Sequence, residues 1–431
     1  MPNPPHRRAV TLALAATALG GAARPDASLA RLLNPASGLP MASAGIIARR
    51  GDGLMAAQAA AGLALGPKAF GVFARDAPFR VASVSKMITT AAFLPLAQRM
   101  GVSLDSDASE HLGFELRHPA HRHTPITVRM LLSHLSGLRN GPSYPVPLGH
   151  RLAEAFTPDG RHFDQGAWFG PPQHAPGTWF AYADVNFALI AQIMERLSGR
   201  RFDLYMHETL FAPLKLDIGY NWSGVSAAKR GKAAAGLRWL AGKWTPQVDA
   251  PPPPFPEISL AHAKDAPNLS IDDYQLGENG FLFSPLGGLR LSLNDMDRLA
   301  RVFAARGKWR GAQIVSNAAL DAMATPAWTL DPEHRNGDTD EGVFQSYGLG
   351  MQTPSGRPGP LGDAFFGGDT ADWRGHLGDA YGWMTGLFWN IKDRRTLVWA
   401  VNGMPETGRP VALRSSLTAP EEALVRIGLA S

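Results

Sequence analysis

The sequence predicts an α+β fold of two lobes, in which an antiparallel β-sheet flanked by helices lies beside a mostly helical lobe. Strand-like runs occur near both ends of the 431-residue chain, and helical runs fill its middle. The simplest packing joins the terminal strands in one sheet, with a cleft between the lobes. We expect one domain over 30–431. Its sheet lobe should combine about 30–85 with 285–431, and its helical lobe should span about 86–284.

The early strands are expected on either side of a turn at Gly51-Asp52-Gly53, over 41–50 and 53–65. Two apolar runs about an Asp-Gly turn are typical of a β-hairpin. The late strands are expected in 346–352, 372–378, 382–391 and 396–404. The last two flank 392–395 and should form a second hairpin.

Helices are expected over 83–98, 126–138, 184–198 and 418–429, with a further helix capped near Asn294. The clearest is 184–198, because its apolar residues fall on one face and Gly199 is a natural stop. Residues 222–280 have few periodic signals and contain a proline run at 251–254. We therefore expect a long loop or insertion there.

The composition is that of an ordinary globular protein, with 45% hydrophobic and 18% charged residues and a formal net charge of +5. The sequence has no dense Lys/Arg tract, so we do not expect nucleic acid as a partner. It has no cysteine, which excludes disulfides, a thiol nucleophile and Cys-ligated metal.

The N-terminus has the pattern of a signal peptide over 1–23. Arg7 and Arg8 precede an uncharged, Ala- and Leu-rich run. The alternative is a helical or disordered extension. We expect export to a bacterial periplasm or the medium, and no integral membrane segment after the signal is removed.

Ser83 and Lys86, in the stretch FRVASVSK, form the pattern of greatest chemical interest. Positions i and i+3 lie on one face of a helix, so the lysine amine can reach the serine hydroxyl. A desolvated lysine can take the proton that keeps serine a poor nucleophile. Free N–H groups at a helix N-terminus would favour a developing oxyanion. Alone, a Ser-x-x-Lys pattern is weak evidence.

Three further segments follow in order: LLSHLSGL at 131–138, Tyr182-Ala183-Asp184, and His376-Leu377-Gly378. With Ser83-x-x-Lys86, they make the chain resemble the serine β-lactamase-like and penicillin-binding-protein-like hydrolases. The resemblance is closest to the branch of class C β-lactamases, D-alanyl-D-alanine carboxypeptidases and esterases. Framework matches extend it from about residue 36 to the end, apart from 222–280.

The resemblance implies a serine hydrolase that works through an acyl-enzyme on Ser83. Lys86 and Tyr182 would handle protons, and the backbone amides of Ser83 and Asp379 would hold the oxyanion. Water would then release the acyl group. No metal or organic cofactor is expected. The expected partner is a small-molecule acyl substrate, which is an ester, amide, peptide or β-lactam.

Two departures from the family pattern bear on the substrate. The usual Tyr-x-Asn ends here in Asp184, which cannot donate a hydrogen bond when ionised. Asn186 is a candidate replacement, and Asp184 could instead cap the following helix. The usual Lys-Thr-Gly is replaced here by His376-Leu377-Gly378, so the titratable His376 stands where the family has a permanently charged lysine. Gly378 keeps the room for a substrate to approach. Both departures favour esters or unusual amides over β-lactams.

Two alternatives stay open: a true β-lactamase or D,D-carboxypeptidase, and a non-catalytic ligand-binding protein on the same fold. His118, His121 and His123 lie in a Pro-containing loop without a second ligand cluster, so no metal site is expected there. His134 is expected to join loops by hydrogen bonds. Substrate identity and oligomeric state are not predicted.

Overall fold

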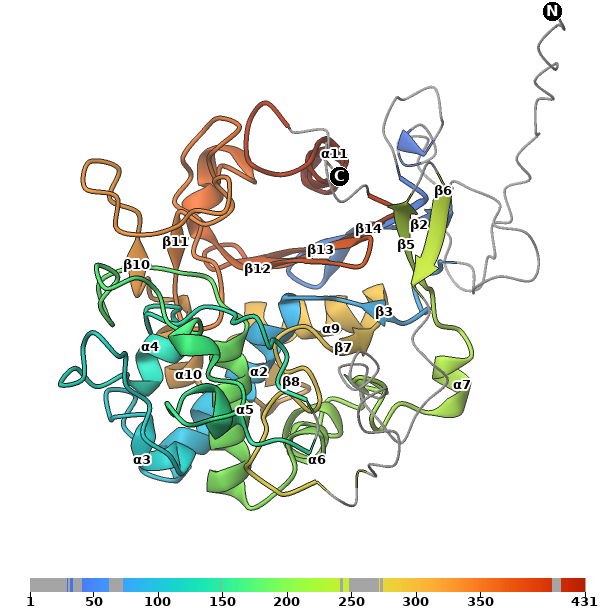
Figure 1. Cartoon of the computed structure of the whole chain (residues 1–431). Helices are drawn as coiled ribbons and strands as arrows, with labels where there is room; N and C mark the ends of the chain where they lie inside the picture. Colours follow the sequence, from blue (N-terminus) through green and yellow to red (C-terminus); the bar gives the residue numbers. More distant parts are fainter. Residues whose placement is uncertain are drawn as a thin grey trace, which may run out of the picture.

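The structure, a computed structural model, describes residues 29, 32–33, 41–61, 73–147, 149–240, 243–247, 271, 274–404 and 412–430. Its central feature is a five-stranded sheet with the strand order β12-β13-β14-β1-β2. In Figure 1, helix α11 lies on one side of this sheet, and helices α9 and α2 lie on the other, with the remaining helices beyond them. This is the α+β arrangement predicted from the sequence.

The sheet joins strands from the two ends of the chain. β1 (Ser43–Arg50) and β2 (Gly53–Ala61) form the expected first hairpin. β12 (Trp373–Ala380), β13 (Trp383–Asn390) and β14 (Arg395–Asn402) form the rest, and all neighbours are antiparallel. β1 pairs with β14 along its whole length. Every residue of β13 is buried, because helices cover both faces of the sheet.

Helix α9 (Leu293–Ala304) covers the face toward the helical region, and α11 (Ala419–Ala430) covers the opposite face. Ser292 caps the N-terminus of α9: its hydroxyl accepts the Asp295 amide while the Asp295 carboxylate accepts the Ser292 amide. This reciprocal cap fixes the start of the helix two residues before the predicted position.

The helical region is built around α2 (Val84–Arg99) and α5 (Val185–Ser198), which pack against each other. α2 is buried on all sides over most of its length, so it is apolar all round rather than amphipathic. α5 ends at Gly199, as predicted, in the left-handed conformation. The shorter helices are α3 (Ser109–Leu112), α4 (Val128–Leu132), α6 (Phe202–Met206), α7 (Ala227–Arg230) and α10 (Asn317–Ala324).

A small three-stranded sheet connects the two regions. It consists of β3 (Phe79–Arg80), β7 (Leu289–Leu291) and β4 (Gly219–Tyr220), in the order β3-β7-β4. This pairing brings the residues before α2 beside those before α9. The other short elements are β5 (Gly236–Leu240), β6 (Lys243–Gln247), β8 (Lys308–Trp309), β9 (Ala312–Gln313), β10 (Trp328–Thr329), β11 (Ser346–Tyr347), η2 (Leu152–Ala155), η3 (Asp164–Gly166), η4 (His207–Phe211) and η6 (Gly367–Asp372).

Three sequence expectations need correction. The helix expected over 126–138 ends at Leu132, because His134 adopts a left-handed φ of 58° and the chain turns away. The strand expected over 346–352 is only Ser346–Tyr347. The described part of 222–280 is not only loop, since it contains α7 and the β5–β6 hairpin.

The expected signal peptide, 1–23, lies outside the described residues. None of the helices within the described ranges has the length and apolar character needed to cross a membrane.

Gly378 on β12 is a position where the fold requires glycine. A methyl group there would lie 2.3 Å from the Val81 carbonyl oxygen and 2.4 Å from Thr385 Oγ1. We predict that Gly378→Ala pushes β12 away from the start of α2 and lowers stability by about 1–3 kcal/mol, as measured by thermal unfolding. Gly368→Ala is the matched control, since nothing lies within 4 Å of a methyl group there. Equal losses in the two variants would contradict the prediction.

Candidate active site

Ser83 stands at the N-terminus of α2, where the main sheet meets the helical region. The residue before it, Ala82, has a φ of +48°, which turns the chain sharply into the helix. Thr385 on β13 donates a hydrogen bond to the Val81 carbonyl at 2.9 Å. Gly378 on β12 lies against the same carbonyl. The sheet thus holds the start of α2 directly, and the Ser83 side chain remains partly exposed.

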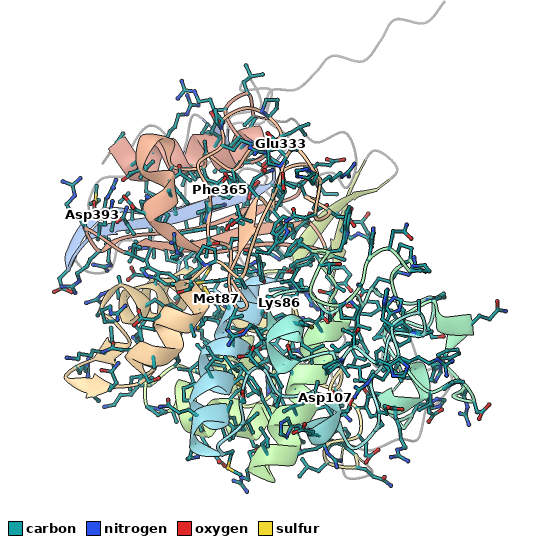
Figure 2. The ribbon with its side chains drawn as sticks, turned by 90° about the vertical axis from the view of Figure 1, so that its left-hand side faces the viewer. Lys86, Met87, Asp107, Glu333, Phe365 and Asp393 are labelled. Carbon is teal, nitrogen blue, oxygen red and sulfur yellow. The ribbon has the colours of Figure 1, made fainter. Side chains whose placement is uncertain are left out.

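Lys86 is fully buried one turn into the same helix. Its Nζ donates to Ser83 Oγ at 3.1 Å, to Asp184 Oδ1 at 2.7 Å and to the Leu286 carbonyl at 2.9 Å. These three contacts use all three donors of an ammonium group. Burial lowers the pKa of Lys86, and the negative charge of Asp184 opposes this shift. Figure 2 shows Lys86 at the end of α2 that faces the sheet.

Asp184 is the N-cap residue of α5, but its side chain makes no capping hydrogen bond. The Asn140 side chain accepts the Val185 amide in its place, at 3.2 Å. The Asp184 carboxylate instead pairs with Lys86 through one oxygen and accepts the Tyr144 hydroxyl through the other, at 2.9 Å. The structure therefore gives no support to the capping role considered from the sequence, and the carboxylate acts on Lys86 instead.

Tyr144 is a site residue that the sequence analysis missed. It lies in the Pro-containing stretch NGPSYPVP, which matches no catalytic pattern. Burial raises the pKa of Tyr144 well above its ordinary value, and the charge of Asp184 raises it further. The phenol therefore stays a hydrogen-bond donor. It completes a polar chain that runs from Tyr144 through Asp184 and Lys86 to Ser83.

Tyr182 lies beside Lys86, with its ring centroid 4.7 Å from Nζ. Its buried hydroxyl makes no hydrogen bond of ordinary geometry. The nearby Ser83 hydroxyl favours the phenolate and so acts to lower the pKa of Tyr182. Burial and the Asp184 charge prevail and raise the pKa of Tyr182 well above its ordinary value. Phe344 stacks on the ring at 4.6 Å between centroids. Tyr182 is therefore a fixed, neutral phenol with an uncommitted hydroxyl.

His376 is neutral and held by both ring nitrogens. Nδ1 contacts the Leu377 carbonyl, which can only accept, so Nδ1 carries the proton. Nε2 then accepts the Tyr347 hydroxyl at 3.0 Å. Burial, with a smaller effect of the Lys86 charge, lowers the pKa of His376 to about 3. The ring therefore does not supply the titratable positive charge that the sequence suggested at this position.

Asp379 follows Gly378 near the end of β12, and its side chain is exposed. The contact of Gly378 with the Val81 carbonyl brings this part of the strand close to the start of α2. The expected oxyanion site, formed by the backbone amides of Ser83 and Asp379, remains a prediction.

Asn186 belongs to a buried hydrogen-bond network behind the site. Its carbonyl accepts the Ser136 hydroxyl at 2.7 Å, and its amide group donates to His134 Nδ1 at 3.0 Å. His134 Nδ1 also accepts the backbone amide of Ala183, at 3.2 Å. His134 has the loop-joining role that was predicted. The structure gives no support to a substrate-binding role for Asn186, because both ends of its amide are used inside the protein.

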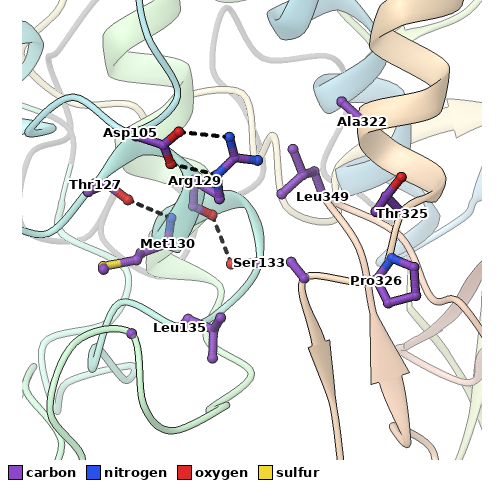
Figure 3. Close-up of a pocket in the computed structure, with 12 residues that line it drawn as sticks. Asp105, Thr127, Arg129, Met130, Ser133, Leu135, Ala322, Thr325, Pro326 and Leu349 are labelled. Carbon is purple, nitrogen blue, oxygen red and sulfur yellow. Dashed lines mark hydrogen bonds and ion pairs between the residues drawn. The ribbon is translucent and has the colours of Figure 1, made fainter.

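A pocket of about 500 Å³ opens between α4 and α10 (Figure 3). None of the candidate catalytic residues lines it. Its polar groups already have partners, since Arg129 pairs with Asp105 at 2.7 and 3.0 Å and Ser133 donates to the Arg129 carbonyl. We therefore do not assign this pocket to the acyl group.

The fold brings Ser83, Lys86 and Tyr182 together at one site. This arrangement places the protein in the penicillin-binding-protein-like class. Residues 67–418 match the Beta-lactamase family, so the chain belongs to that family. Its members are serine hydrolases that include esterases, amidases and peptidases.

Two curated relatives match part of the chain. Monacolin J acid methylbutanoyltransferase of Aspergillus terreus is 30% identical over 154 residues, or 32% of this chain and 37% of that protein. The D-alanyl-D-alanine-carboxypeptidase/endopeptidase AmpH of Escherichia coli K12 is 26% identical over 139 residues, or 32% of this chain and 35% of that protein. The matches thus span little more than a third of either relative's length.

The solved structure of EstCE1, a hydrolase with promiscuous acyltransferase activity, has the same fold. Its TM-score is 0.63 at 18% identity, and the match covers 94% of this chain and 99% of that one.

Asp184→Asn tests the charge relation at the centre of the site. Asp184 raises the pKa of Lys86, so its neutralisation lowers that pKa, and the proton-accepting free amine persists to lower pH. We predict that the acid limb of the kcat/KM profile for an ester shifts down by about one pH unit. Asp105→Asn, at an exposed ion pair, is the control and should leave the profile unchanged. An unmoved or upward-shifted limb in Asp184→Asn would show that Lys86 does not set it.

Proposed function

We propose that the protein is a serine hydrolase that cleaves an uncharged ester through an acyl-enzyme on Ser83. The observation that carries this proposal is the 3.1 Å contact between Ser83 Oγ and the fully buried Lys86 Nζ. Burial lowers the pKa of that lysine, which favours the free amine needed to take a serine proton. Membership of the Beta-lactamase family supports the same chemistry.

In the proposed reaction, Ser83 Oγ attacks the ester carbonyl while its proton passes to Lys86. The backbone amides of Ser83 and Asp379 would hold the oxyanion. Tyr182, whose hydroxyl is uncommitted, would give its proton to the leaving alcohol and regain one from Lys86. Water then attacks the acyl carbonyl and passes a proton to Lys86 and Tyr182. These residues return the proton to Ser83 Oγ as the acyl–serine bond breaks, which frees the serine. No metal is needed for these steps.

The charges around the site favour an uncharged substrate. His376, with a pKa of about 3, offers no positive charge to the carboxylate of a β-lactam or of a peptide C-terminus. Asp184 would repel such a carboxylate and, when ionised, cannot donate a hydrogen bond to an amide carbonyl. An uncharged ester needs neither a positive charge for a carboxylate nor a hydrogen-bond donor for an amide carbonyl.

Acyl transfer is a second candidate, because the acyl-enzyme could be released by an alcohol instead of water. The Aspergillus terreus relative is named as a methylbutanoyltransferase, and EstCE1 is described as having promiscuous acyltransferase activity. A true β-lactamase or D,D-carboxypeptidase is favoured by the similarity to AmpH. A non-catalytic binding protein is favoured by two departures from the family's catalytic motifs, which are Asp184 in place of Asn and the absence of Lys-Thr-Gly.

Hydrolysis of p-nitrophenyl butyrate and of a chromogenic cephalosporin, measured side by side, tests the proposal. We predict that the ester is cleaved faster and that Ser83→Ala lowers its cleavage by at least about 1,000-fold. Ser103→Ala, at an exposed serine beyond the far end of α2, should retain full activity. Product analysis with an added alcohol distinguishes transfer from hydrolysis.

Three results would change the proposed function. Faster cleavage of the cephalosporin would favour the β-lactamase alternative. Ester cleavage that survives Ser83→Ala would place the chemistry elsewhere. Cleavage of neither substrate would favour the binding protein.

We also propose that the protein is exported, on the pattern of residues 1–23 alone. Fractionation of cells that express the full chain tests this. Recovery of uncleaved protein only in the cytoplasm would contradict it.

A further inference from the structure

A second group of chemically reactive side chains lies outside the proposed active site, on the loop that follows Tyr144. His150, Glu154 and His162 each offer one donor atom, and these atoms all lie within 4.8 Å of one another. The two imidazoles approach most closely, with His150 Nδ1 2.7 Å from His162 Nε2. This group is distinct from His118 and His121, whose Nε2 atoms contact backbone carbonyls.

The backbone holds these three residues in place before any ligand arrives. Glu154 lies in η2, where its Oε1 accepts the Arg151 amide at 3.1 Å. The His162 amide donates to the Glu154 carbonyl at 3.2 Å, and the Trp168 indole donates to the His162 carbonyl at 2.6 Å. The His150 carbonyl accepts the Asn279 side chain at 3.0 Å. A preformed backbone reduces the ordering needed when a ligand binds.

We propose that His150, Glu154 and His162 form a binding site for a divalent transition metal ion such as Zn²⁺. Two imidazole nitrogens and a carboxylate oxygen are a common zinc ligand set, at bond lengths of about 2.0–2.2 Å. Tetrahedral coordination at those lengths separates the donors by about 3.3 Å. The two imidazole nitrogens, now 2.7 Å apart, would therefore separate by about 0.6 Å. A fourth position stays open to water. Mg²⁺ and Ca²⁺ prefer all-oxygen sites.

Arg161 is the group that opposes metal binding. Its Nη1 lies 3.2 Å from His150 Nε2, and its Nε lies 3.9 Å from Glu154 Oε2. Its side chain is 67% exposed, so it can move away into solvent. Because the guanidinium is always charged, its removal favours a bound cation. Arg161→Ala is therefore a variant expected to strengthen binding, which damage to the fold would not do.

The site is placed to stabilise the segment that positions Tyr144. The Asn279 side chain donates to the carbonyls of Val146, Pro147 and His150, so one side chain holds residues close to Tyr144 and a metal ligand together. A bound ion stabilises the folded state by a free energy that grows with the logarithm of its affinity. Metal binding at this site and the stability it provides are independent of the reaction proposed for Ser83.

Titration of the tag-free full chain with Zn²⁺ by calorimetry, together with thermal unfolding, tests the proposal. We expect one site per chain and a higher Tm with Zn²⁺, and neither effect with Mg²⁺. His162→Ala should weaken binding by about 100-fold and Glu154→Gln by about 10-fold. Arg161→Ala should tighten it by about 10-fold. His123→Ala, at an exposed histidine outside the cluster, should bind as the parent does.

Two results would overturn the proposal. One is the absence of Zn²⁺ binding by the parent chain. The other is binding whose affinity is the same in the parent, His162→Ala and Arg161→Ala, which would place the ion elsewhere. Far-ultraviolet circular dichroism of each variant separates loss of the ligand from loss of the fold.

Discussion

The burial of one lysine amine beside a serine is the constraint on which the rest of the structure depends. Removing an ammonium group from water costs several kcal/mol unless charge and hydrogen bonds replace its hydration. Asp184, Ser83 and the Leu286 carbonyl provide that replacement. They come from α5, the start of α2 and the turn before β7, so these elements must meet at one point. The main sheet fixes that point, because Thr385 binds the chain just before Ser83.

The same balance of charge restricts the chemistry of the site. Tyr144 and Tyr182 are kept neutral by burial and by the nearby carboxylate, and His376 is kept neutral by burial. Lys86 and Asp184 are therefore the charged groups beside the proposed nucleophile until Lys86 gives up its proton. A family member with Asn at position 184 would lack that pairing. Here the hydroxyl of Tyr144 supports the substituted carboxylate, so the departure from the family pattern is built into the surrounding structure.

Local sequence patterns predicted much of the fold, because the β1–β2 hairpin, α5 and α11 follow from periodicity and turn residues nearby in the chain. They failed over 126–138, where His134 leaves the helix and binds the distant Ala183 and Asn186. Spacing predicted that the Lys86 amine reaches the Ser83 hydroxyl, and the 3.1 Å contact confirms this proximity. Spacing and resemblance could not predict Leu286, which acts through a backbone carbonyl that every residue has, or the neutrality of His376, which depends on burial.

Labelling with an organophosphonate that forms a stable adduct on activated serines, followed by peptide mass spectrometry, tests the role of the Lys86–Ser83 pair most directly. The pair predicts one adduct, on the peptide that contains Ser83. It also predicts the loss of this adduct in Lys86→Met, which removes the amine and keeps a similar buried volume. Undiminished labelling of Ser83 in that variant, or an adduct on a different serine, would contradict the assigned role.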